Sequence, residues 1–189
     1  MEKPLDSLFS GLIASKVRIN LLTRFFFNPN TRSYLRELAK EFQVSTNSVR
    51  EELNQLTKTG LLNSEKNGRN ILYKANEQHP LFPELKSMVS KAMGIDQVID
   101  SIVTRLGDLE KAYLIDDYAE GKDTGIVDLL LVGDIDQYHL NDLSRKTERY
   151  IKRKIRSLVL TQEEFTEFSP KLKEKSRVLI WENKTEKSE

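Results

Sequence analysis

Two short amphipathic segments separated by only three residues constrain the first half of this chain more than any other feature. In residues 34–42 and 46–60, apolar side chains recur every three or four positions, the spacing of one helix face. They are Leu35, Leu38, Ala39 and Phe42 in the first segment and Val49, Leu53 and Leu56 in the second. Gln43-Val44-Ser45 leaves room for a tight turn only. Ser45 fits the N-cap of the second helix, and Asn47 or Ser48 could satisfy the amides of its first turn. The pattern predicts two helices that cross closely at Ala39.

A further helix is predicted before this pair and a hairpin after it. Residues 16–27, KVRINLLTRFFF, repeat apolar side chains at helical spacing and end at the turn Asn28-Pro29-Asn30. The stretch LLNSEKNGRNILYKA reads as two short strands, Leu61–Ser64 and Asn70–Lys74, joined by a turn around Asn67-Gly68. This order of elements predicts a winged helix-turn-helix.

Residues 32–76 resemble the ArsR-type winged-helix regulators in the order of these motifs. The resemblance implies that the second helix of the pair enters the major groove of duplex DNA, while the hairpin, or wing, contacts the backbone or the minor groove. Carried over by position, the DNA-binding residues are Thr46, Asn47, Ser48, Arg50 and Asn54 in the groove, Lys58 near phosphates, and Lys66, Asn67, Arg69 and Asn70 on the wing. The resemblance also implies a homodimer, because such proteins usually dimerise through helices that flank the winged unit.

A protein-interaction module, such as an antitoxin-like partner, remains an alternative. Helix-turn-helix units also serve as pure protein-binding modules, and Glu51 and Glu52 are awkward beside phosphates. Against this, Arg50 and the asparagines of the helix have side chains that read guanine and adenine edges, and the wing tip Lys66-Asn67-Gly68-Arg69 has no obvious role in a core. Glu52 could lie off the DNA-facing side, and Glu51 could accept a hydrogen bond from a cytosine amino group.

Composition excludes several classes of site and points to an anionic partner. Residues 1–75 contain 12 Lys or Arg against 7 Asp or Glu, whereas residues 76–189 contain 18 against 22. The absence of cysteine excludes disulfides, a thiolate nucleophile and Cys-ligated zinc, and two histidines make a histidine metal site improbable, so we expect no metal and no cofactor. We see neither a signal peptide nor 18 consecutive apolar residues, and expect a cytoplasmic protein without a membrane segment.

Residues 113–136, YLIDDYAEGKDTGIVDLLLVGDID, read as a strand, a turn and a second strand. They resemble the signature of minimal nucleotidyltransferases, in which a Gly-Ser pair grips a triphosphate and Asp-x-Asp holds Mg²⁺. Here the Gly-Ser positions are Asp116 and Asp117, and Asp-x-Asp is Ile126-Val127-Asp128. A charged helix, the strand IRSLVLT, a helix opening with QEEF and the strand RVLIW follow in the family order. The third-strand position where active members often carry another carboxylate falls among Arg156 and Ser157.

Electrostatics predict that this second domain is catalytically inactive. Two carboxylates at the phosphate-gripping turn repel a polyphosphate by about 1 kcal/mol per charge pair at 4 Å in water and about 4 kcal/mol near a protein surface. A lone Asp128 is a poor site for Mg²⁺, which needs near-octahedral oxygen coordination. An active nucleotidyltransferase that uses Asp128 with Asp116 or Asp117 as relocated metal ligands remains the rival reading.

The middle of the chain and the end of the second domain are predicted from helical spacing and turn residues. His79 to Pro83 reads as an extended link, followed by a helix that ends near Gly94 and is the candidate dimerisation element. A second helix is predicted from Asp96 to Leu106, and His139 is predicted to lie in a loop before a helix over Asn141–Lys152. We interpret the basic run from Arg145 to Arg156 as a solvated helix face.

The predicted fold class is α+β, with an N-terminal winged helix-turn-helix and a small C-terminal α/β nucleotidyltransferase-like domain that has a mixed sheet. We assign residues 1–79 to the DNA-binding domain, 80–107 to a helical linker and possible dimerisation region, 108–183 to the degenerate domain and 184–189 to a frayed tail. The predicted function is transcriptional regulation by a homodimer on double-stranded DNA. The inactive second domain would act as a scaffold or as a sensor of an unidentified small-molecule effector.

Overall fold

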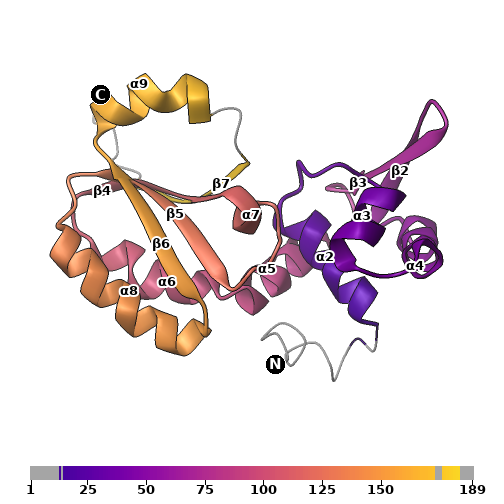
Figure 1. The fold of residues 1–189 in the computed structure, drawn as a ribbon, viewed down its shortest axis with the longest axis horizontal. Coiled ribbons are helices and arrows are strands. Elements are labelled where there is room, and N and C mark those ends of the chain that lie inside the picture. Colours follow the sequence, from indigo (N-terminus) through magenta and orange to yellow (C-terminus); the bar gives the residue numbers. More distant parts are fainter. Residues whose placement is uncertain (1–12, 14, 173–175, 184–189) are drawn as a thin grey trace. The chain divides into compact units, whose positions relative to one another are not determined.

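A computed structural model describes residues 13, 15–172 and 176–183 and divides the chain into two compact units (Figure 1). Unit 1 spans Met1–Met93, and unit 2 spans Gly94–Glu189. The boundary falls inside the range 80–107 that the sequence analysis assigns to a linker, so the candidate dimerisation helix belongs to unit 1. The predicted tail, residues 184–189, lies outside the described residues.

Unit 1 contains four helices and three strands within its described residues. In chain order they are α2 (Lys16–Phe27), β1 (Ser33–Tyr34), α3 (Leu35–Phe42), α4 (Thr46–Lys58), β2 (Leu62–Asn67), β3 (Asn70–Ala75) and α5 (Phe82–Ala92). The strands form an antiparallel sheet in the order β1-β3-β2. The helix pair and the wing of a winged helix-turn-helix are therefore both present, and α2 has the predicted bounds.

The core of unit 1 lies where α2, α3 and α4 meet. Leu21, Phe25 and Phe26 of α2 are completely buried, as are Leu38 of α3 and Leu53 of α4. Burying a side chain of this size contributes about 1.5–3 kcal/mol, so these apolar stripes fix how each helix is rotated about its own axis. The rotation in turn decides which polar residues of α4 face outward.

Local hydrogen bonds at the start of α4 confirm one capping prediction and correct another. The Ser45 hydroxyl is the N-cap acceptor and receives the backbone N–H of Ser48 at 3.1 Å. The prediction that the side chain of Asn47 or Ser48 satisfies amides of the first turn is wrong. Asn47 bonds Glu51 and Arg50, and the Ser48 hydroxyl bonds that of Ser45 at 2.8 Å.

The wing is longer than the sequence predicted. β2 and β3 pair without interruption from Leu62 opposite Ala75 to Asn67 opposite Asn70, whereas the prediction ended the first strand at Ser64. Only Gly68 and Arg69 remain in the turn, and the φ of +60° at Gly68 matches a type II′ hairpin turn, which places glycine first. The outer half of the hairpin is exposed on both faces, so no hydrophobic alternation marks it in the sequence.

Unit 2 is built on a four-stranded sheet. Its described elements are α6 (Ile95–Ser101), the 3₁₀ turn η1 (Val103–Arg105), β4 (Leu109–Ile115), α7 (Asp116–Ala119), β5 (Ile126–Gly133), α8 (Gln137–Ile151), β6 (Lys154–Leu160), α9 (Gln162–Leu172) and β7 (Arg177–Glu182). The strand order is β6-β5-β4-β7, and only β5 and β6 run parallel. The prediction of a mixed sheet is confirmed.

Helices cover both faces of this sheet. Figure 1 shows α6 and α8 on one side and α9 on the other. On the α9 side, Leu172 packs with Leu130 of β5 and Leu160 of β6, and Phe165 stacks on Tyr113 of β4 with ring centroids 5.6 Å apart. Residues Val127 to Val132 of β5 are almost wholly buried, as expected for a central strand covered on both faces.

Two predictions for unit 2 and one for the segment before α5 are corrected. His139 lies within α8 rather than in a loop, because Asp136 caps the helix early by accepting the backbone N–H of Tyr138 at 2.8 Å. The helix predicted to reach Leu106 breaks after Ser101 into a 3₁₀ turn, and this change of geometry lets the adjacent Ile102 and Val103 both be buried. The predicted extended link before α5 is a turn.

One ion pair is buried inside unit 2. Arg153 donates to Asp123 at 2.8 and 3.2 Å and to the carbonyl of Ile151 at 2.9 Å, and the two side chains of the pair are 2% and 5% exposed. Burial raises the pKa of the neighbouring Tyr118 hydroxyl. Arg153 is thus not part of the solvated helix face to which the sequence analysis assigned it.

We predict that Asp123→Asn destabilises unit 2 by about 3–5 kcal/mol, because it leaves the Arg153 guanidinium buried without its counter-charge. Trp181 is the single tryptophan and lies in β7, so its fluorescence reports urea unfolding of this unit. The matched control is Asp142→Asn, whose carboxylate pairs with Lys146 in solvent. Equal urea midpoints for the two variants would contradict the assignment of Asp123 and Arg153 as a buried ion pair.

Candidate nucleic-acid interface

Helix α4 divides cleanly into a buried and an exposed side. Val49, Leu53 and Leu56 are buried against the rest of unit 1. Five of the six helix residues predicted to face DNA are exposed on the other side, namely Thr46, Asn47, Arg50, Asn54 and Lys58. Ser48 differs, since it is half-buried and takes part in the N-cap.

The two glutamates of α4 lie in different surroundings. The Glu52 carboxylate turns inward to α2, where Arg18 Nε lies 2.7 Å from it, and its side chain is only 15% exposed. Arg18 also donates to the side-chain oxygen of Gln55. Glu51 is exposed and accepts a hydrogen bond from the Asn47 amide at 2.9 Å. One of the two acidic charges that the sequence places on this helix is therefore neutralised by an internal arginine.

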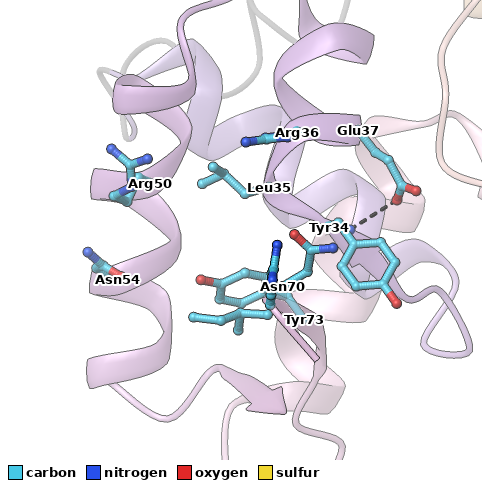
Figure 2. Close-up of a pocket in the computed structure, with 10 residues that line it drawn as sticks. Tyr34, Leu35, Arg36, Glu37, Arg50, Asn54, Asn70 and Tyr73 are labelled. Carbon is cyan, nitrogen blue, oxygen red and sulfur yellow. Dashed lines mark hydrogen bonds between the residues drawn. The ribbon is translucent and has the colours of Figure 1, made fainter. Parts of the chain in front are cut away.

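A pocket of about 440 Å³ opens where α3, α4 and the wing meet (Figure 2). Figure 2 shows Arg50 and Asn54 along α4 on one side and Asn70 and Tyr73 of the wing on the other. The residues that line it are Tyr34, Leu35, Arg36, Glu37, Arg50, Asn54, Arg69, Asn70, Ile71 and Tyr73. It thus brings together four residues predicted separately from the helix and the wing: Arg50, Asn54, Arg69 and Asn70.

The pocket is cationic. It holds three guanidinium groups, those of Arg36, Arg50 and Arg69, against one carboxylate. That carboxylate, Glu37, already accepts the backbone N–H of Tyr34 at 3.0 Å. The start of α3 also lines the pocket, and the partial positive charge of a helix N-terminus favours anions. This arrangement suits an anion with several oxygen acceptors.

The wing is tied to the helix pair beside this pocket. Asn67 Nδ2 donates to the Tyr34 hydroxyl at 2.7 Å, and Tyr34 pairs with Leu72 in the sheet. Burial raises the pKa of Tyr73, while the nearby Arg50 opposes that shift. The sequence analysis did not identify Tyr34, Arg36 or Tyr73 as site residues. The two-residue strand Ser33–Tyr34, whose pairing turns the start of α3 toward the wing, is too short to leave a pattern.

A second polar cluster joins the central strand β5 to the edge strand β6 in unit 2. Asp128 of β5 is 6% exposed and accepts a hydrogen bond from Arg156 Nε at 2.6 Å. The two residues are direct partners in the parallel pairing of β5 and β6. The Asp128 carboxylate raises the pKa of Arg156, and Asp116 adds to the effect at longer range. The buried carboxylate that the sequence analysis singled out is therefore paired with the largely exposed side chain of Arg156.

The two turn aspartates open helix α7. Asp116 has a positive φ of 54°, and Asp117 is largely exposed, with its carboxylate 3.7 Å from Lys122 Nζ. Over the described residues, no group of three or more Asp, Glu or His side chains could hold a metal ion. None of the helices in the described part of the chain is long and apolar enough to cross a membrane.

Comparison with known proteins gives little further guidance. No family model matches the chain, and no curated protein does so. Among solved structures, the chain is similar to reduced HlyU from Vibrio cholerae N16961, with 18% sequence identity and a TM-score of 0.36 over 47% of this chain and 85% of that one. Similarity at this level supports no conclusion about function, which has to be argued from the geometry above.

Proposed function

We propose that the chain is an ArsR-like, DNA-binding transcriptional regulator that grips duplex DNA through α4 and the wing of unit 1. The observation that carries this proposal is the cationic pocket, in which arginines from α3, α4 and the wing turn meet beside Asn54 and Asn70. A guanidinium offers five donors in a planar fork that matches phosphate oxygens. Three such groups around one pocket have no use in a core, but they suit a strand of phosphodiesters.

The polar residues that line the pocket divide between two roles in this proposal. Arg36, in the first turn of α3, and Arg69, in the wing turn, hold backbone phosphates together with Asn70. Arg50 and Asn54 lie one turn apart on α4 and contact base edges in the major groove. The ion pair of Glu52 with Arg18 removes one charge that would oppose phosphates.

We predict that Arg69→Ala weakens binding to all duplexes evenly and lowers the slope of log affinity against log salt by about 1, because one phosphate contact is lost. Arg50→Ala should cost about 1–3 kcal/mol on the preferred site and relax sequence preference. Fluorescence anisotropy on a selected and a scrambled duplex, at several salt concentrations, measures both effects.

Lys86→Ala is the matched control, because it removes one exposed charge of unit 1 from α5, away from the pocket. Unchanged duplex binding in both arginine variants would overturn the proposed function. It would favour the protein-interaction alternative instead.

We further propose that the regulator acts as a homodimer through α5. Leu81, Glu84, Met88 and Lys91 recur at helical spacing on one outward stripe, and Leu81 is 55% exposed. Across a two-fold axis, antiparallel α5 helices would bury Leu81 and Met88 and place Glu84 of one copy beside Lys91 of the other. A single winged helix also makes few contacts for a specific site, whereas two copies can bind half-sites a helical turn or more apart.

Sedimentation should show a dimer for the unmodified chain and a monomer for Met88→Glu, because the new carboxylate would be buried without a partner. Lys86→Glu introduces the same side chain on the opposite, exposed side of α5 and should leave the dimer intact. A chain that stays monomeric at micromolar concentration, both free and on DNA, would contradict the dimer.

For unit 2, we propose a nucleotidyltransferase-like fold that transfers no nucleotide and serves as a scaffold or an effector sensor. Two observations support inactivity. The Gly-Ser positions are aspartates, and Asp128 already forms an ion pair with the largely exposed side chain of Arg156, so a divalent cation would have to displace that guanidinium from the carboxylate. A site with one such carboxylate cannot hold two-metal geometry.

Incubation with each labelled nucleoside triphosphate and Mg²⁺ or Mn²⁺, alone and with cell extract, should therefore label nothing. Labelling that disappears in Asp128→Asn but persists in Asp134→Asn, an exposed aspartate just beyond the same strand, would restore the enzyme reading. A thermal-shift screen with small molecules, with and without DNA, tests the sensor role separately.

A further inference from the structure

We infer that a hydrogen-bonded row of three side chains on α4, formed by Arg50, Asn47 and Glu51, reads neighbouring guanine and cytosine edges in the major groove. Arg50 takes the guanine, and Glu51 takes the cytosine. The inference rests on the proposed function, since it names the bases that the same helix selects. In this inference Glu51 determines sequence specificity, although its negative charge is unfavourable beside phosphates.

The three side chains are linked across the exposed side of α4. Arg50 Nη1 donates to the Asn47 side-chain oxygen at 3.3 Å, and Asn47 Nδ2 donates to Glu51 Oε1 at 2.9 Å. Asn47 has one amide orientation in which both contacts join a donor to an acceptor. The reverse orientation would set its NH₂ against a guanidinium and its oxygen against a carboxylate. The row therefore runs in a fixed direction, from a cation to an anion.

The internal bonds leave the ends of the row free to bind a ligand. Arg50 uses one of the five N–H donors of a guanidinium, and Glu51 uses one of its two carboxylate oxygens. Because these bonds already hold the side chains, less rotamer freedom is lost when a ligand binds. The row presents donors at one end and an acceptor at the other.

Base edges in the major groove match this pattern. Guanine presents two acceptors, N7 and O6, which a guanidinium contacts with two parallel bonds, and cytosine presents the N4 amino donor, which a carboxylate accepts. Thymine places the O4 acceptor where Glu51 needs a donor, and adenine places its N6 amino donor where Arg50 needs a second acceptor. Adenine also offers that amino group to Glu51, but its neighbouring N7 acceptor repels the carboxylate, whereas cytosine has no such acceptor beside its amino group. A guanine and a cytosine side by side therefore satisfy both ends of the row best.

The contrast with Glu52 shows why Glu51 calls for a function. Both are glutamates on the same helix, yet Glu52 is tucked against Arg18 and Glu51 stands among the exposed residues Asn47, Arg50 and Asn54. An unneutralised carboxylate facing DNA repels phosphates and lowers affinity for every sequence. A cytosine amino group in front of it offsets that repulsion at one sequence only, so Glu51 raises selectivity at the expense of overall affinity.

The test selects duplexes from a random pool with the full chain and with two variants. The unmodified chain should enrich a cytosine next to a guanine, with a preference of about 5- to 150-fold at the cytosine over other bases. Glu51→Ala should lose that preference and bind scrambled duplex more tightly. Glu52→Gln is the matched control and should keep the preference, with its folding checked by thermal unfolding because it breaks the contact with Arg18.

A cytosine analogue without the 4-amino group gives a second readout. A site that carries this analogue should bind the unmodified chain about as weakly as a site with a wrong base does. The same analogue should not weaken DNA binding by the Glu51→Ala variant any further. A chain that binds a preferred site but keeps its cytosine preference in Glu51→Ala overturns this inference and leaves the proposed function standing. A chain that binds no duplex at all overturns both.

Discussion

The burial of one stripe of α4 is the constraint on which the candidate interface depends. Val49 and Leu53 are completely buried, so α4 cannot rotate about its axis without exposing them, at a cost of several kcal/mol. That fixed rotation sends Glu52 to Arg18 and leaves Asn47, Arg50 and Asn54 outward. The outward row of polar side chains is thus positioned by apolar contacts on the far side of the same helix.

Paired charges shape both units. In each unit a carboxylate that would oppose an anion forms an ion pair with an arginine of the same unit: Glu52 with Arg18 in unit 1, and Asp128 with Arg156 in unit 2. The consequences differ. In unit 1 the ion pair neutralises one acidic charge of α4, next to a cationic pocket. In unit 2 the ion pair occupies the Asp128 carboxylate, which a metal ion would need as a ligand. Glu51 is the acidic group of α4 that stays outward, bonded only to another outward side chain.

Periodicity was sufficient to predict the first three helices of unit 1, but not the pocket. Residues 16–27 and the turn before Ser45 follow from apolar spacing, caps and turn residues, whereas the mixed sheet was expected from the resemblance to nucleotidyltransferases. The pocket needs Tyr34, Arg36 and Tyr73, which come from elements distant in sequence and meet only after the sheet forms. Arg153 sits in a run of basic residues like any solvated cation, and only its distance to Asp123 reveals that it is buried.

The register of the two sheets sets an order of folding. The sheet of unit 1 closes between neighbouring strands, β2 and β3, across a two-residue turn, and short loops close fastest. In unit 2, β4 is flanked by β5 and by β7, and β7 follows α8, β6 and α9 along the chain. One side of β4 therefore stays unpaired until the segment Arg177–Glu182 has left the ribosome. During synthesis, unit 1 can reach its native state first, while unit 2 still exposes an open strand edge.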